Sequence, residues 1–248
     1  MNILGIDIGG SALKGAPVNI KTGQLLAERH RISTPEVLTP KAMAAAVNEL
    51  AKHFSWKGPI GIGFPGVIHD NVILTSANLH KDFIGCDAGQ LFGKATGLPV
   101  SLLNDADAAG IAEVKFGAGK GVAGTILLLT FGTGVGSALF VDGRLYPNSE
   151  FGHLPFNDKD AERLVSAAAK DRKGLSYKKW AHKVSDYLNI LENVLWPRLI
   201  IAGGGISADH DKWFKYLKVR TPVVVASFLN EAGIVGAALS VKQTGGRE

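Results

Sequence analysis

Cysteine is almost missing from this chain of 248 residues, which holds a single one, Cys86. A lone cysteine excludes an internal disulfide and any zinc cluster built on cysteine ligands. Long apolar runs are missing as well, since the run 126–129 is bounded by Thr125 and Thr130 and falls far short of the roughly 20 residues that span a bilayer. The opening residues carry no basic stretch and no cleavage signature, so we expect no signal peptide. We therefore expect a cytoplasmic protein with no membrane partner.

Acidic residues are the scarcer charged group, because 22 Asp and Glu stand against 27 Lys and Arg and leave a formal net charge of +5. The excess is local. Positions 163, 170, 172, 173, 178, 179 and 183 are all Lys or Arg, and Asp171 is the one acid among them. Such a segment can bind a polyanion through ion pairing and counterion release, although a solvated helix face would carry the same residues. No helix-turn-helix, zinc finger or aromatic platform accompanies it, so we expect no nucleic-acid partner.

Glycine, in contrast, is concentrated in two short turns. The first is Gly9-Gly10-Ser11 and the second is Gly132-Thr133-Gly134, and each stands between two apolar runs. Each therefore predicts a strand, a tight turn and a second strand. Glycine leaves backbone N–H groups unshielded by side chains, which suits a concave phosphate site, but a plain hairpin without a ligand would use the same residues.

Neighbouring residues favour the phosphate interpretation of both turns. Asp7 and Lys14 flank the first turn, and Thr130 precedes the second. The tetrapeptide Gly-Ser-Ala-Leu also occurs beside both, at 10–13 and 136–139. We therefore expect a duplicated fold in which two similar turns hold a phosphoryl donor.

Strands precede helices in both halves of the chain, which predicts an α/β protein of two lobes with a ligand in the central cleft. Strands are expected over 2–9, 12–20, 24–31, 59–64, 67–74, 100–103, 124–131, 135–141, 198–203 and 222–226. Helices are expected over 40–54, 87–96, 105–116, 160–171, 176–195 and 231–241. Asn104 and Ser176 are the expected N-caps of two of these helices.

Five motifs in order give the chain a resemblance to a known family. They are Asp7-Ile8-Gly9-Gly10-Ser11, Asn104-Asp105, Gly132-Thr133-Gly134-Val135-Gly136, Glu150-Phe151-Gly152-His153 and Gly203-Gly204-Gly205. Together they resemble the ROK-type sugar kinases over nearly the whole chain. The resemblance implies the actin-like ATPase fold with two ribonuclease-H-like lobes, here 1–105 plus 231–248 as the small lobe and 106–230 as the large lobe.

One departure from that family separates this chain from most members. Most members have a cysteine-rich zinc knot after Glu-x-Gly-His, whereas residues 154–162 contain no cysteine. We therefore expect no structural zinc. The stretch Asp160-Ala161-Glu162 and the segments 175–182 and 230–239 resemble the polyphosphate glucokinase branch. This implies transfer of a phosphoryl group from inorganic polyphosphate, and in some members from ATP, to O6 of glucose.

The resemblance also implies roles for single residues. Asp105 is the expected general base, since a carboxylate there can accept the O6 proton of the sugar. The expected glucose-binding residues are Gly66, Asn78, Asn104, Asp105, Glu150, His153 and Glu162. The expected phosphate-binding residues are Asp7, Gly9, Gly10, Ser11, Lys14, Thr130, Gly132, Thr133, Gly134, Gly204 and Gly205. Asp7 is expected to hold Mg²⁺ through water.

Two other functions stay open at this point. One is a strictly ATP-dependent glucokinase or another hexose kinase acting on mannose or an amino sugar, since 203–205 would lie under an adenine in ATP-using relatives. The other is a sugar sensor, which the chain disfavours because it begins on its first strand. By analogy we expect a homodimer, and we expect the basic segment 163–183, with Lys120, to hold polyphosphate.

Overall fold

A computed structural model of the chain describes residues 1–34, 39–76 and 79–244. The chain divides into two compact units, of which unit 1 holds Met1–Ala112 and Glu231–Glu248 and unit 2 holds Glu113–Asn230. The first division falls inside helix α3 (Asp105–Phe116), whereas the sequence places the change of lobe after 105. The assignment of lobes stays a prediction.

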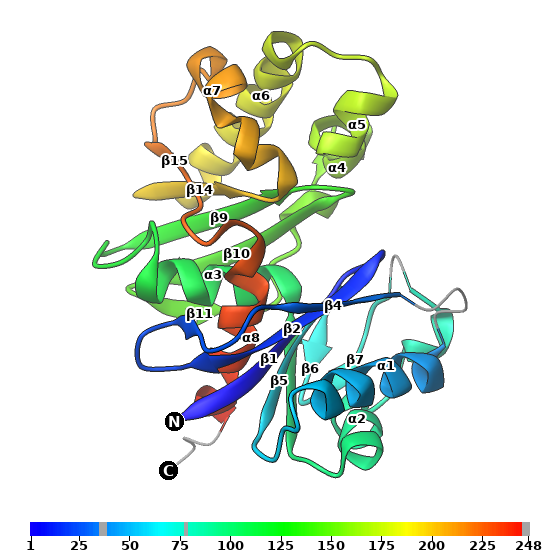
Figure 1. Ribbon diagram of the computed structural model, residues 1–248. Helices are drawn as coiled ribbons and strands as arrows, with labels where there is room; N and C mark the ends of the chain where they lie inside the picture. The colour runs from blue at the N-terminus through cyan, green and yellow to red at the C-terminus, as the bar shows by residue number, and fades with distance from the viewer. Residues whose placement is uncertain (35–38, 77–78, 245–248) are drawn as a thin grey trace. The chain divides into compact units, whose positions relative to one another are not determined.

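Unit 1 is built on a mixed sheet with the strand order β3-β2-β1-β5-β8, in which β4 also pairs with β2 (Figure 1). The strands are β1 (Asn2–Ile8), β2 (Ala12–Asn19), β3 (Gln24–Leu25), β4 (His30–Ser33), β5 (Ile60–Phe64) and β8 (Val100–Asn104). β1 and β2 are antiparallel, while β1, β5 and β8 run parallel to one another. The carboxyl ends of these three parallel strands therefore meet at one edge of the sheet.

Helices cover both faces of this sheet. On one face Leu4, Ile6 and Ile8 join a buried cluster with Val47 of α1 (Pro40–His53) and Phe92 of α2 (Ala88–Thr96). Alternate strand residues point to opposite faces, and the other face packs against α8 (Ala232–Thr244). Each fully buried aliphatic side chain contributes about 1.5–3 kcal/mol, so the cluster fixes which face each β1 side chain occupies.

Unit 2 repeats the plan with the strand order β11-β10-β9-β14-β15. The strands are β9 (Thr125–Phe131), β10 (Val135–Val141), β11 (Arg144–Tyr146), β14 (Leu199–Gly203) and β15 (Val223–Val225). β9 pairs antiparallel with β10 and parallel with β14, as β1 does with β2 and β5. The prediction of a duplicated α/β fold is confirmed.

Aromatic side chains form the centre of the unit 2 core. Phe131 lies edge-on to both Trp180 and Trp213, with ring centroids 5.8 and 6.0 Å away. The indole of Trp180 donates to the carbonyl of Val165 at 2.9 Å, so its polar atom is satisfied inside the core. Phe131 is the last residue of β9, and this packing anchors the strand at the point where the second glycine turn begins.

Helix α6 (Tyr177–Leu195) is the longest helix of unit 2 and agrees closely with its prediction. The Ser176 hydroxyl caps it by accepting from the amide of Lys179 at 3.3 Å, as expected. The helix ends at Trp196, which adopts the left-handed conformation with φ 47°, and Pro197 follows. The predicted N-terminal cap of α3 is confirmed as well. The Oδ1 atom of Asn104 accepts from the amides of Ala106 and Asp107 at 2.8 and 3.0 Å.

Two predicted elements are wrong in detail. The strand expected over 24–31 is split into β3 and β4, which pair with β2 in registers that differ by two residues. The shift falls opposite Pro17, which has no N–H to donate to a regular ladder. The helix expected over 160–171 is also split, because Ser166 is extended and its hydroxyl caps a new helix by accepting from Ala169.

Short elements complete the two units. In unit 1 they are β6 (Ile68–His69), β7 (Val72–Ile73) and the 3₁₀ helix η1 (Lys81–Phe83). In unit 2 they are η2 (Phe151–His153), β12 (Pro155–Phe156), β13 (Lys159–Asp160), α4 (Glu162–Val165), α5 (Ala167–Arg172), η3 (Gly205–Asp209), α7 (His210–Trp213) and η4 (Phe214–Tyr216). The 3₁₀ helix η5 (Leu229–Glu231) lies at the second division. Within 1–34, 39–76 and 79–244, no helix has the length and apolar character needed to cross a bilayer.

Candidate active site

The carboxyl-end edge of the unit 1 sheet gathers several of the predicted site residues. β1 leads into the turn 9–11, β5 leads into the loop that holds Gly66, and β8 leads directly into Asp105. The parallel pairings Asp7 with Gly63 and Phe64 with Asn104 bring these three exits side by side. Ligands of α/β sheets bind outside the carboxyl ends of the strands, so this edge is a candidate site.

The first glycine turn is fastened at its outer side by Thr34. The amide of Gly9 donates to the carbonyl of Ala12 at 3.0 Å and closes the hairpin. Thr34 donates its amide to the Ser11 carbonyl and its hydroxyl to the Gly9 carbonyl, both at 3.2 Å. Among the residues that the structure describes, a Cβ at Gly10 would meet nothing within 4 Å, so those residues do not require glycine there. A glycine that the fold does not need fits a backbone that a ligand approaches closely.

Asp7 and Lys14 lie directly opposite each other on β1 and β2, next to this turn. Opposed residues of an antiparallel pair share a face of the sheet, and here that face is the one that packs against α8. Gly233 of α8 leaves room for the carboxylate, because a Cβ there would lie 2.8 Å from Cγ of Asp7. Burial raises the pKa of Asp7 and the charge of Lys14 lowers it, with burial the larger cause. The surroundings of Asp7 therefore disfavour its charged form, although Lys14 lies opposite it.

Asn104 and Asp105 occupy the junction between β8 and α3. The Asn104 amide is largely used by the protein, since its oxygen caps α3 and its Nδ2 donates to the Gly66 carbonyl at 3.2 Å. Gly66 is itself held closely, because a Cβ there would overlap the carbonyl of Thr75. Asp105 is partly exposed, and its Oδ1 accepts from the amide of Ala106 at 2.8 Å. Asn104 therefore fixes the strand-to-helix corner from which the Asp105 carboxylate projects.

The second glycine turn lies at the carboxyl-end edge of the unit 2 sheet. The amide of Gly132 donates to the carbonyl of Gly134 at 3.0 Å, and a Cβ at Gly132 would meet no described residue within 4 Å. Gly203 pairs with Thr130 across β14 and β9, which brings the loop 203–205 beside the turn. Gly204 has φ 81° and packs against the backbone of Phe131, so glycine is required there by the fold. The predicted phosphate-binding residues 130–134 and 204–205 therefore share one edge.

Glu162 reaches the second turn from α4. Its Oε2 accepts from the amide of Val135 at 3.3 Å, and a Cβ at Gly134 would overlap that same oxygen. Gly134 thus has a different reason to be glycine from Gly132: it makes room for a carboxylate of the chain itself. A carboxylate beside a predicted phosphate turn does not bind phosphate, so this position suits recognition of hydroxyl groups.

The segment that carries Glu150 and His153 is fixed to the rest of unit 2 by buried hydroxyl groups. The Ser137 hydroxyl of β10 donates to the Ser149 carbonyl at 2.5 Å and accepts from the amide of Phe151 at 2.9 Å. The Tyr187 hydroxyl of α6 donates to the Phe151 carbonyl at 3.0 Å. These anchors hold η2 between β10 and α6, so Glu150 and His153 project from a rigid support.

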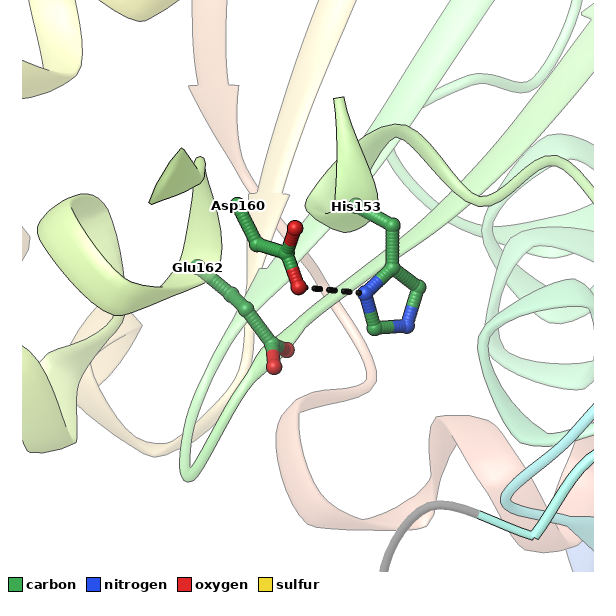
Figure 2. Close-up of side chains that lie close together, drawn as sticks. All are labelled: His153, Asp160 and Glu162. Atoms are coloured by element: carbon green, nitrogen blue, oxygen red, sulfur yellow. Dashed lines mark hydrogen bonds and ion pairs between the residues drawn. The ribbon is translucent and has the colours of Figure 1, made fainter. Parts of the chain in front are cut away.

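His153 lies close to several carboxylates, and Figure 2 shows Asp160 and Glu162 on the same side of its ring. Its Nδ1 lies 3.3 Å from Oδ2 of Asp160, and its Nε2 lies 3.9 Å from Oε2 of Glu150. Burial raises the pKa of Glu150, the imidazole of His153 lowers it, and the charge of Glu162 raises it. The result is a row of hydrogen-bonding groups with mixed polarity, which suits a ring of sugar hydroxyls.

The same cluster has the composition of a metal site. His153, Asp160 and Glu162 offer ligand atoms that all lie within 4.8 Å of one another. All three already have partners within the protein, because Asp160 bonds to His153 and Glu162 accepts from the amide of Val135. The absence of structural zinc stays a prediction. For Mg²⁺ the better candidate is Asp7, since that ion takes one or two carboxylates together with phosphate oxygens and water.

Several residues of the candidate site are not among the predicted ones. Asp160 contacts His153 directly, while Thr34, Ser137 and Tyr187 hold the loops that carry predicted residues. Only the recurrence of Gly-Ser-Ala-Leu draws attention to Ser137 in the sequence. Predicted residue Asn78 lies outside the described residues. The predicted residues thus fall into one group in each unit: 7–14, 66, 104 and 105 in unit 1, and 130–134, 150, 153, 162, 204 and 205 in unit 2.

The family model "ROK family" matches residues 3–164. A polyphosphate glucokinase of Mycobacterium tuberculosis (strain CDC 1551 / Oshkosh) is 48% identical over 237 residues, which are 95% of this chain and 89% of the relative. The polyphosphate glucokinase of Mycobacterium leprae is 46% identical, with 95% of this chain and 73% of the relative covered.

Solved structures agree with the observed fold. The crystal structure of the inorganic polyphosphate/ATP-glucomannokinase from Arthrobacter sp. strain KM superposes with a TM-score of 0.94 at 43% identity, covering 98% of this chain and 99% of that one. A ROK family glucokinase from Streptomyces griseus, solved with glucose and AMPPNP, has a TM-score of 0.81 at 23% identity, covering 98% and 100%. The second likeness concerns the fold alone.

Proposed function

This chain belongs to the ROK family, and from that premise we propose that it transfers a phosphoryl group from inorganic polyphosphate to O6 of glucose. The product would be glucose 6-phosphate. The observation that carries the proposal is the pair of glycine turns at the carboxyl ends of β1 and β9. Beside the second turn, Glu162 lies close to His153 and Asp160, and these groups suit the hydroxyl groups of a sugar. The names of the relatives with 46–48% identity supply the sugar and the donor.

Glucose recognition is assigned to Glu150, His153 and Glu162, with Gly66, Asn78 and Asn104 as further candidates. Carboxylates accept hydrogen bonds, and the imidazole donates through one nitrogen and accepts through the other. A sugar that lacks one of the matched hydroxyls would leave a buried polar group unpaired, which is how such a site selects its acceptor. Asp160, which contacts Nδ1 of His153, orients the ring so that Nε2 is available to the sugar.

Asp105 is assigned the role of general base. Its carboxylate would accept the proton of the attacking O6 hydroxyl while the phosphoryl group transfers. The position supports the assignment, because Asp105 begins α3, is partly exposed and stands on a corner fixed by Asn104. A base of this kind contributes about 10²–10⁴-fold to the rate.

Donor binding is assigned to the backbone N–H groups of the two turns, to Lys14 and to the hydroxyl groups of Ser11, Thr130 and Thr133. Amide and hydroxyl donors aimed at phosphate oxygens stabilise the charge that develops in transfer. Asp7 would hold Mg²⁺ through water, and the ion would supply positive charge to the phosphates when bound. The pKa of Asp7, raised by burial, supports this role, since a cation would supply the missing compensation.

ATP is the alternative donor. The loop 203–205 beside the second turn is retained here, and the Arthrobacter relative is named for both polyphosphate and ATP. Mannose is the alternative acceptor for the same reason, because that relative is a glucomannokinase. A homodimer and a cytoplasmic location stay predictions.

The proposal is tested by initial rates of purified protein with each donor and acceptor in turn. Polyphosphate, tripolyphosphate and ATP are paired with glucose, mannose and glucosamine, and the sugar phosphate formed is quantified with Mg²⁺ present. We expect the highest kcat/KM with polyphosphate and glucose. Turnover with ATP alone would overturn the donor, and turnover of another sugar in preference to glucose would overturn the acceptor.

A further inference from the structure

Four cations of unit 2 lie close enough to influence one another, and one of them, Lys159, directly precedes Asp160. Arg172 and Lys173 stand at the C-terminal end of α5, Lys159 on β13, and Lys183 on α6. Their elements pack together, since α4 contacts β13, α5 and α6. Arg172 folds back to donate to the Arg163 carbonyl at 3.4 Å. We call these four residues the basic cluster.

The members of the basic cluster are near enough to repel one another. Desolvation and then the charges of Lys183, Lys159 and Arg172 lower the pKa of the Lys173 ammonium. Within the described part of the chain, none of the four forms an ion pair with a carboxylate. Uncompensated like charges cost folding free energy, so a surface that keeps them gains when an anion binds.

One other basic residue of the segment 163–183, Lys170, already has partners within the protein. Lys170 pairs with Asp171 at 2.7 Å and lies over the ring of Tyr177, 4.6 Å from its centroid. Lys170 therefore does not belong to the cluster, although the sequence groups it with Arg172 and Lys173. Of the predicted basic segment 163–183, the basic cluster therefore keeps Arg172, Lys173 and Lys183. It adds Lys159, which precedes that segment in the sequence.

Helix α5 connects the basic cluster to the second glycine turn. At its start the amide of Ala168 donates to the Gly132 carbonyl at 3.1 Å. At its end stand Arg172 and Lys173. A helix of this length rises about 1.5 Å per residue, so its two ends are roughly 8 Å apart. A linear anion with its reacting end at the turn would need only a few more units to reach the cluster.

We propose that the basic cluster binds the distal phosphates of a polyphosphate chain whose terminal phosphate occupies the glycine turn 132–134. This inference rests on the proposed function, because it takes polyphosphate as the donor. ATP and tripolyphosphate are too short to use the cluster fully. The cluster therefore gives preference to long donors without contacting the transferred group.

The test compares R172Q/K173Q/K183Q with the wild-type enzyme and with K21Q/K57Q/K94Q. The control variant removes the same charge from three exposed lysines of unit 1. Three exposed cation contacts together are worth about a 10-fold change, so we expect the KM for long-chain polyphosphate to rise about 10-fold. The KM values for tripolyphosphate and ATP should rise much less. The slope of log KM for long chains against log salt concentration should also decrease, because fewer counterions are released.

A second variant and a binding measurement separate an effect on polyphosphate binding from a general loss of activity. K173Q/K183Q retains the hydrogen bond of Arg172 to Arg163 and should show a smaller rise in the same KM. Calorimetric titration with long-chain polyphosphate reports binding without turnover. Equal KM values in the cluster and control variants, in an enzyme that uses polyphosphate, would overturn the basic cluster alone. A wild-type enzyme that neither turns over nor binds polyphosphate would overturn the proposed function and the cluster with it.

Discussion

The two glycine turns occupy equivalent places in the two units but differ in what surrounds them. Each spans three residues, leaves a strand at its carboxyl end and enters an antiparallel strand. The first is flanked by the charged pair Asp7 and Lys14 and is fastened by Thr34. The second has no such pair in its own hairpin; instead Glu162 reaches it from a helix. The same type of turn thus stands beside an opposed carboxylate and lysine in one unit and beside a helix carboxylate in the other.

This difference separates two demands of phosphoryl transfer. Charge on phosphate has to be neutralised, which a lysine and a metal-binding carboxylate can do. The acceptor has to be selected, which carboxylates and an imidazole at fixed positions can do. Gly10 and Gly132 have open space where a Cβ would be, whereas Gly134 is filled by Glu162. Substitutions can therefore test each turn separately.

The largest effect is expected from Asp105→Asn on the unit 1 side. The amide keeps the shape but cannot accept the O6 proton, so kcat should fall by about 10²–10⁴ while glucose binding persists. Steady-state kinetics with saturating polyphosphate, together with calorimetric binding of glucose, check this. Asp70→Asn is the matched control, since Asp70 is exposed in the same unit and its positive φ of 48° suits asparagine. A D105N enzyme with native kcat would contradict the assignment.

Alanine at the open glycines should impair the donor without unfolding the protein. A methyl group at Gly10 or Gly132 meets no atom of the described residues within 4 Å, so the melting temperature should hold. The same methyl group would stand where phosphate approaches, and a misplacement of about 1 Å can cost about 10²-fold in kcat/KM for the donor. Differential scanning calorimetry and donor kinetics measure the two effects.

Gly134→Ala is the contrasting variant, because its methyl group would displace Glu162. It should lower both the melting temperature and kcat/KM for glucose. If G132A and G134A behaved alike in both measurements, the distinction between an open and a filled turn would be lost.

Asp160→Asn should weaken sugar recognition by about 10-fold in kcat/KM for glucose, as loss of a residue that orients a functional histidine commonly does. We expect the carboxylate, 3.3 Å from Nδ1 of His153, to attract the proton to that nitrogen, which would leave Nε2 as an acceptor. Nitrogen NMR of labelled histidine should show one tautomer in the wild-type enzyme and a mixture in D160N. Asp158→Asn, an exposed neighbour, should change neither. An unchanged tautomer in D160N would mean that Asp160 does not position the ring.

The smallest effect concerns stability near Glu150. Its pKa in the folded state is raised above the ordinary 4.5, chiefly by burial, so the folded protein holds a proton that the unfolded chain releases. Stability is therefore lost as pH rises from the unfolded pKa through the folded one. Glu150→Gln should melt slightly higher than the wild-type enzyme at pH 7 and equally near pH 4, while binding glucose less well. Glu28→Gln, exposed in unit 1, should show no such pH dependence.

Local signals in the sequence predict much of this fold, and long-range contacts account for what they miss. The glycine turns, the caps Asn104 and Ser176 and the helix that ends before Pro197 all follow from neighbouring residues. Ser166 splits a predicted helix because its hydroxyl caps a new one, a choice stabilised by the distant Trp180 that bonds Val165. The spacing of residues does not reveal such a partner.

The candidate site shows the same limit. Motif residues such as Asp105, Glu150 and His153 can be found because their types and order resemble a family. Ser137 and Tyr187 fix the same loop through hydroxyl groups, but serine and tyrosine in a strand and a helix are unremarkable in a sequence. Asp160 acquires its contact with His153 only through the short β12–β13 hairpin.

The most direct test of the central claim is phosphorus NMR of wild-type protein mixed with glucose, Mg²⁺ and long-chain polyphosphate in the absence of nucleotide. The account predicts that a phosphomonoester signal of glucose 6-phosphate grows as the polyphosphate end-group pattern changes, with little free orthophosphate. Release of orthophosphate without the ester, or an ester that forms only after ATP is added, would contradict it.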